Sequence, residues 1–188
     1  MKNHIVLIGG WFSSVMPYFM AWAWKLQTRL IKHYGNPELG GRMKKVTGSN
    51  IKIWVVSSDG SGEHEAIEAI LKDWKAGKLG DVSVCGHSNG GGELDIISQI
   101  FYNKIKIAYA ATIDRTLGYT GSKLWGSVQY FDEFWAGLRK TKFHSTFTGV
   151  KNFWDLDKIL KQDIGHTPSA SHPFVQDKIF TEVTKRIK

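Results

Sequence analysis

Cysteine occurs only once in this 188-residue chain, at Cys85. A single cysteine excludes a disulfide within the chain and a zinc site built from clustered cysteines. Cys85 lies within an apolar run, which favours a buried strand residue over a reactive thiol. This cysteine usage predicts a reducing, cytoplasmic setting.

Sequence motifs for nucleotide or metal binding are also missing. The chain has no Gly-x-x-x-x-Gly-Lys-Ser/Thr loop, and its first apolar run ends in Gly9-Gly10-Trp11 rather than in Gly-x-Gly-x-x-Gly. The seven histidines never occur as His-Glu-x-x-His or beside a carboxylate at the spacing of metal ligands. We therefore expect no cofactor and no metal.

A long, uniformly apolar run is absent as well. Residues 5–24 carry no charge and end near Ala21-Trp22-Ala23, which is similar to a signal-peptidase site, but glycine, serine and Pro17 interrupt them. A membrane-spanning helix is more uniformly apolar. We therefore interpret this segment as a strand, a turn and the start of a helix that belong to the fold.

The net charge of the chain is +8, from 25 Lys and Arg against 17 Asp and Glu. The basic residues are scattered and form neither a basic arm nor the aromatic-basic ladder that nucleic-acid binding uses. We therefore expect no nucleic-acid partner, and only a weak attraction to anionic surfaces.

Short apolar runs alternate with helical periodicity along the chain, and no repeat or linker divides it. This alternation is typical of βαβ units. We predict one domain over residues 1–188, an α/β fold with three layers (α/β/α) and a mostly parallel sheet of about five to six strands. The predicted strands cover residues 4–8, 51–57, 81–85, 105–113 and 142–148.

Helical spacing of apolar residues predicts the helices. They follow the first strand as far as Gly35, cover residues 89–102, and begin at Pro173. Another helix follows the second strand, with Ile67, Ile70, Leu71 and Trp74 on its inner face. Residues 118–139 are rich in glycine and aromatics, and we interpret them as a crossover helix or, alternatively, as a lid or apolar wall.

Residues 86–90, Gly-His-Ser-Asn-Gly, match the Gly-x-Ser-x-Gly nucleophile elbow. In this motif a sharp turn from a strand to a helix presents the serine, and the flanking glycines leave room for close backbone packing. An apolar strand ends just before the motif here, and an apolar helix pattern begins just after it. This context favours Ser88 as a nucleophile over a structural turn.

On these residues the chain resembles the α/β-hydrolase family, in particular its small single-domain lipases, esterases and thioesterases from microbes and phages. The resemblance rests on the elbow, on the strand end Thr112-Ile113-Asp114, and on residues 163–166, Asp-Ile-Gly-His, before the last helix. It implies Ser88 as nucleophile, a late histidine as base, and an acid between them in the chain.

A serine hydroxyl needs an imidazole to take its proton, and the imidazole needs a carboxylate to fix its tautomer. His166 is the preferred base because it lies in a loop before the last helix, from which it can reach Ser88. His172 is the alternative, although its place beside Pro173 at the helix entrance fits a surface role better.

Asp114 is the preferred acid because it ends the strand that follows the nucleophile strand. Asp155 or Asp157 would instead place the acid one strand later. The oxyanion of the reaction needs backbone N–H donors, which we expect from Asn89 and from the Gly10-Trp11 loop.

These residues predict a serine hydrolase that cleaves a carboxylic ester or thioester through an acyl-enzyme on Ser88. The partner would be a small or lipid-like ester, held against aromatic side chains near Trp11 and in residues 118–135. Two alternatives stay open: an inactive hydrolase-fold interaction protein, and a serine amidase or peptidase.

Overall fold

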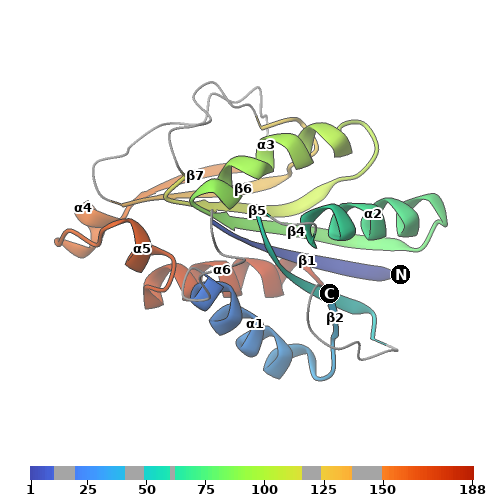
Figure 1. The fold of residues 1–188 in the computed structure, drawn as a ribbon, viewed down its shortest axis with the longest axis horizontal. Coiled ribbons are helices and arrows are strands. Elements are labelled where there is room, and N and C mark those ends of the chain that lie inside the picture. The colour runs from blue at the N-terminus through green and yellow to red at the C-terminus, as the bar shows by residue number, and fades with distance from the viewer. Residues whose placement is uncertain (11–19, 41–48, 60–61, 116–123, 137–149) are drawn as a thin grey trace.

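The computed structural model describes residues 1–10, 20–40, 49–59, 62–115, 124–136 and 150–188 (Figure 1). Among these residues, seven parallel strands form one sheet in the order β2-β3-β1-β4-β5-β6-β7. The strands are β1 (Lys2–Gly9), β2 (Glu38–Gly40), β3 (Ile51–Ser57), β4 (Leu79–His87), β5 (Ile107–Ile113), β6 (Tyr130–Trp135) and β7 (Val150–Asp155). The α/β fold with a parallel sheet is confirmed, and the sheet has slightly more strands than predicted.

Helices cover both faces of the sheet, so the fold has three layers (Figure 1). The helices are α1 (Ala21–Tyr34), α2 (Gly62–Lys75), α3 (Asn89–Phe101), α4 (Leu156–Leu160), α5 (His166–Ser169) and α6 (Pro173–Arg186). α1 and α6 pack on one face, and α2 and α3 pack on the other. None of the helices in the described part of the chain combines the length and the hydropathy needed to cross a membrane.

The central strand β1 shows why this sheet is buried on both sides. Ile5 and Leu7 belong to the core under α1 and α6, whereas Val6 and Ile8 belong to the core under α2 and α3. Successive side chains of a strand point to opposite faces, so a strand covered on both sides is a continuous apolar run. The apolar runs of the sequence therefore predicted β1, β3, β4 and β5 correctly.

The position of β1 also creates a place for a site. β1 lies between β3 and β4. The chain leaves β1 through α1 on one face of the sheet and leaves β4 through α3 on the opposite face (Figure 1). In open α/β sheets, ligands bind at such a switch point, outside the carboxyl ends of the strands. Gly10 and Ser88 follow these two strand ends directly.

The interpretation of residues 118–139 as a crossover helix is wrong for β6, which lies within them. Within β6 the Asp132 carboxylate is buried in the sheet. It accepts hydrogen bonds from Tyr109 Oη at 2.9 Å, Asn152 Nδ2 at 2.8 Å and Trp154 Nε1 at 3.0 Å. These neighbours on β5 and β7 satisfy a charge that would otherwise be costly inside a core.

Three smaller expectations also differ from the structure or fall outside it. Trp74 is 38% exposed, not on the inner face of α2, because it lies at the end of this helix where the chain turns toward β4. The three-residue edge strand β2 was not predicted. The predicted strand over residues 142–148 lies outside the described residues, and so do the parts of the suggested lid at 118–123 and 137–139.

Candidate active site

Ser88 stands alone between β4, which ends at His87, and α3, which begins at Asn89. Its backbone has φ 56° and ψ −121°, a region that non-glycine residues rarely adopt and that often marks functional sites. The Ser88 N–H donates to the carbonyl oxygen of Ile113 at 2.9 Å, which ties the turn to β5. The serine is thereby presented at the carboxyl edge of the sheet.

The glycines on either side of Ser88 are required by backbone packing. A Cβ on Gly86 would lie 2.1 Å from the Gly90 carbonyl oxygen, and a Cβ on Gly90 would lie 2.5 Å from that of Gly9. Both obstacles are main-chain atoms, which cannot rotate away as a side chain can. The sharp turn that the sequence motif predicted is therefore built as expected.

Gly10 contacts the serine from the end of β1. A Cβ on Gly10 would lie 2.9 Å from Ser88 Cβ and 3.3 Å from Ser88 Oγ. Asn89 is the first residue of α3, where backbone N–H groups have no partner within the helix. Two of the three predicted oxyanion-hole residues, Gly10 and Asn89, therefore adjoin Ser88, whereas Trp11 lies outside the described residues.

His166 bridges Ser88 and Asp114. Its Nε2 lies 2.9 Å from Ser88 Oγ, and its Nδ1 lies 2.5 Å from Asp114 Oδ2. A carboxylate only accepts hydrogen bonds, so Nδ1 carries the proton and Nε2 is left to accept from the serine hydroxyl. The histidine side chain is 34% exposed and that of Asp114 is 1% exposed. The three residues thus form one continuous hydrogen-bonded line.

Asp114 is held at the end of β5 by residues in and after β6. Its N–H donates to the Phe134 carbonyl oxygen at 2.7 Å, and its Oδ1 accepts from the Ala136 N–H at 3.2 Å. The backbone of Asp114 has φ 41°, an unusual value that aspartate tolerates better than most residues. Both carboxylate oxygens are therefore occupied, one by the backbone and one by the histidine.

The alternative residues of the sequence analysis lie at the starts of α4 and α6. Asp155 is the N-cap of α4 and accepts from the Lys158 N–H at 3.3 Å. Asp157 Oδ1 accepts from the Ile164 N–H at 3.2 Å. His172 is the N-cap of α6, and its Nδ1 accepts from the Phe174 N–H at 3.2 Å. The carboxylate at Nδ1 of His166 is Asp114.

One contact at this site was missed by the sequence analysis. His87 Nε2 lies 3.1 Å from the backbone carbonyl oxygen of His166, which also accepts from Ser169 Oγ at 2.7 Å. Burial, together with the nearby His166, lowers the pKa of His87 to about 4. The position of a histidine just before the serine was visible in the sequence, but its partner lies 79 residues further along the chain.

Other features of the described residues offer little for binding at this site. Cys85 is fully buried and burial raises its pKa to about 12, which confirms it as an inert strand residue. No group of three His, Cys, Asp or Glu side chains among the described residues could hold a metal ion.

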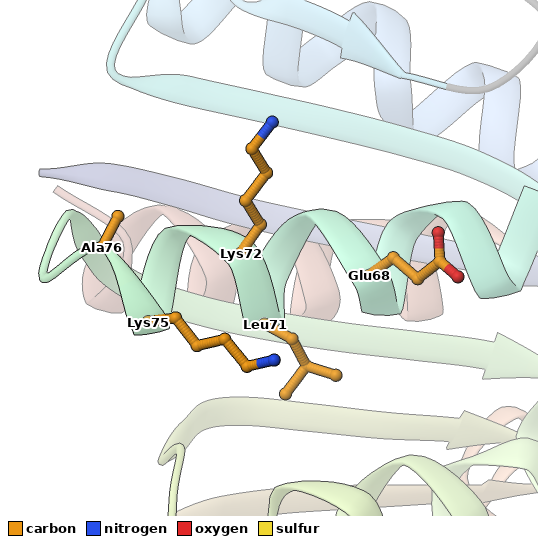
Figure 2. A pocket seen from close by; sticks show the side chains of 5 residues that line it. All are labelled: Glu68, Leu71, Lys72, Lys75 and Ala76. Atoms are coloured by element: carbon orange, nitrogen blue, oxygen red, sulfur yellow. The ribbon is translucent and has the colours of Figure 1, made fainter.

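A shallow hollow lies on the surface of α2 (Figure 2). It is lined by Glu68, Leu71, Lys72, Lys75 and Ala76. These residues extend from the middle of α2 to Ala76, just after the helix and before the start of β4. Ser88 follows the opposite end of β4, so the hollow is separate from the candidate site.

Along the chain, the serine at position 88 comes first, the aspartate at 114 second and the histidine at 166 last. Ser88 and Asp114 follow β4 and β5 directly, and His166 begins α5, after β7 and α4. Their geometry is the basis for a functional proposal. Comparisons with models of protein families, with curated proteins and with solved structures found no match to the chain.

Proposed function

We propose that this protein is a serine hydrolase of the α/β-hydrolase type that cleaves carboxylic esters or thioesters. One observation carries the proposal: Ser88 Oγ, the His166 imidazole and the Asp114 carboxylate are joined by contacts of 2.9 Å and 2.5 Å. Nucleophile, base and orienting acid are the parts that acyl transfer to a serine requires.

The first half of the reaction would acylate the serine. Ser88 Oγ attacks the carbonyl carbon of the substrate while its proton passes to His166 Nε2. The tetrahedral intermediate then collapses, the bond to the leaving oxygen or sulfur breaks, and the leaving group takes the proton from Nε2. Asp114 stabilises the imidazolium that exists between these two transfers, because its carboxylate accepts the Nδ1 proton's hydrogen bond.

The second half would release the acid. A water molecule attacks the acyl carbon and gives a proton to His166 Nε2, which then returns it to Ser88 Oγ as the ester bond to the serine breaks. The exposed fraction of His166, 34%, gives water a route to this nitrogen. The products are the free carboxylic acid and the regenerated serine.

Backbone N–H groups would stabilise the oxyanion of both intermediates. The N–H of Asn89 lies at the start of α3, where the helix dipole also favours negative charge. The turn after β1 is the second candidate source, because Gly10 lies against Ser88 without an intervening side chain. Loss of one such donor typically costs about 2.7 to 4 kcal/mol of transition-state stabilisation.

Aromatic side chains beside the site favour an acyl group with apolar character. Trp135 ends β6, next to the Phe134 carbonyl that Asp114 contacts, and its ring lies 5.2 Å from that of Phe153. Phe153 is 42% exposed and so offers apolar surface to a ligand.

We further propose that the protein acts in the cytoplasm, since its only thiol is buried and unpaired.

Labelling with a fluorophosphonate probe tests the proposal. We expect the intact protein to react at Ser88, and Ser88→Ala and His166→Ala to lose the reaction, whereas Ser171→Ala should react like the intact protein. Either an intact protein that does not react or a Ser88→Ala variant that reacts equally would contradict the proposal, and the first outcome would favour an inactive interaction protein.

Matched ester and amide substrates separate the remaining classes. Hydrolysis of p-nitrophenyl esters without hydrolysis of the corresponding anilides supports the esterase proposal, and hydrolysis of the anilides indicates an amidase or peptidase. A series of esters from acetate to palmitate then measures how long an acyl chain the site accepts.

A further inference from the structure

We propose that His87 is a positioning residue, whose Nε2–H group donates to the backbone carbonyl of His166 and so holds the base in line with Ser88. The inference rests on the proposed function, because it assigns His166 the role of base. In this role His87 would act on the reaction only through His166.

Two consecutive residues of the elbow reach the same histidine from two sides. Ser88 Oγ lies 2.9 Å from the His166 side chain at Nε2, and His87 Nε2 lies 3.1 Å from the His166 main chain at its carbonyl oxygen. The two imidazole rings lie close, with their centroids 4.9 Å apart and their planes inclined by 30°. The side chain and the backbone of the base are therefore both fixed relative to the nucleophile.

The segment around His166 packs into the core through Ile164 and Ala170, and His87 adds a hydrogen bond to the main chain of His166 itself. α5 is only four residues long, and the preceding Gly165 has φ 68°. Residues 161–163 before it are exposed. The hydrogen bond from Ser169 to the His166 carbonyl lies within α5 itself and cannot tie α5 to the sheet. The bond from His87 makes that connection, because His87 is the last residue of β4.

The environment of His87 suits a neutral donor. A carbonyl oxygen only accepts, so Nε2 carries the proton, and the buried Nδ1 has no hydrogen-bond partner among the described residues. Protonation of Nδ1 would place an unpaired charge in the core, next to His166 and near Asp114. His87 therefore stays uncharged at neutral pH and adds no positive charge beside the imidazolium that forms during the reaction.

Two substitutions test the hydrogen-bond donor of His87 and its ring separately. His87→Phe keeps a planar ring but removes the donor. His87→Gln places an amide nitrogen near the position of Nε2 and keeps the donor. His33→Gln is the matched control, since His33 is exposed in the last turn of α1, at the opposite edge of the sheet.

Steady-state hydrolysis of p-nitrophenyl acetate gives the first readout. We expect His87→Phe to lower kcat by about 10- to 100-fold with KM within about threefold, because small misplacements of a catalytic group are costly. His87→Gln should recover kcat to within about threefold of the intact protein, and His33→Gln should not change it. A folded His87→Phe variant with full kcat, or a loss confined to KM, would overturn the inference.

Proton NMR gives a readout that does not need activity. The Nδ1 proton of His166, shared with Asp114, should give a far-downfield signal in the intact protein. We expect His87→Phe to broaden or abolish this signal and His87→Gln to restore it. If the intact protein lacks esterase activity but the signal follows this pattern, the proposed function fails and the positioning role stands. If the intact protein is active and His87→Phe changes neither the signal nor kcat, the proposed function stands and the positioning role is refuted.

Discussion

Asp114 Oδ2 and His166 Nδ1 lie 2.5 Å apart although 52 residues separate them in the chain. The aspartate ends a central strand and is almost completely buried, whereas the histidine lies in a short helix at the surface. Their contact fixes which imidazole nitrogen faces Ser88.

Asp114→Asn should abolish most activity without unfolding the protein. Asparagine tolerates the positive φ of this position and can still accept from Ala136, but its amide can stabilise the wrong histidine tautomer. We expect kcat to fall by about 10⁴-fold. Asp155→Asn is the control, because asparagine also caps helices well, and it should stay within about twofold of the intact protein. Equal losses in both variants would refute the role given to Asp114.

Gly10→Ala should damage the site more than the fold. Its new Cβ would lie 2.9 Å from Ser88 Cβ, so either the serine or the turn after β1 must move. We expect the rate of fluorophosphonate labelling to fall by about 100-fold, as small displacements of reacting groups do. Gly77→Ala introduces a methyl group at φ 65° in open space, and should cost about 1 kcal/mol of stability without slowing the labelling. A Gly10→Ala variant that labels at the normal rate would contradict the close contact.

Asp132→Ala should strongly destabilise the sheet. The substitution leaves Tyr109 and Trp154 with buried or partly buried donors that have lost their acceptor, and Asn152 keeps only its bond to Tyr130 Oη. We expect the free energy of unfolding, measured by urea denaturation, to fall by about 3 to 5 kcal/mol. Tyr109→Phe removes one donor and leaves the carboxylate with two, so its loss should be nearer to about 1 kcal/mol. Equal effects of the two variants would show that the network does not centre on Asp132.

Glu63 should make the protein less stable as the pH rises toward 8. Burial, together with the nearby Glu93, raises the pKa of this carboxyl to about 8 in the folded state, whereas the ordinary value is 4.5. Between these values the unfolded chain loses a proton that the folded chain keeps, so stability is complete below pH 4.5 and declines through pH 8.

Urea denaturation at pH 5 and pH 8 measures this effect. Glu63→Gln has no proton to lose at this position, so its free energy of unfolding should fall less between pH 5 and pH 8 than that of the intact protein. We expect the two decreases to differ by on the order of 1 kcal/mol or more. Glu65→Gln, at an exposed position of the same helical turn, should keep the pH dependence of the intact protein. Identical pH dependence in all three proteins would show that Glu63 titrates normally.

Much of the fold could be predicted because the central strands are buried on both faces. β1, β3, β4 and β5 are short apolar runs, and helical periodicity follows each of the first three. β6 was missed because it lies in a segment rich in glycine and aromatics without a long apolar run, and its buried Asp132 is satisfied only by partners on β5 and β7. Such partners depend on tertiary structure, which a local pattern does not contain.

The candidate site was predictable to different degrees for the same reason. Ser88 is marked by a local motif, and local backbone packing explains its glycines. The choice among Asp114, Asp155 and Asp157 was open, because each follows a strand and a sequence does not show which strand end faces the histidine. The contact between His87 and the carbonyl of His166 could not be predicted, since a backbone atom has no sequence signature.

The reactivity of the buried Cys85 thiol can be used to measure local unfolding. The only thiol in the chain lies three residues before Ser88, on the strand between β1 and β5, and has no exposed surface. A thiol reagent can reach it only when these central strands separate, so the labelling rate under native conditions measures how often the sheet opens beneath the nucleophile. This rate can be compared before and after Ser88 is covalently blocked. The difference would measure how strongly a group bound at the site stabilises the central strands against opening.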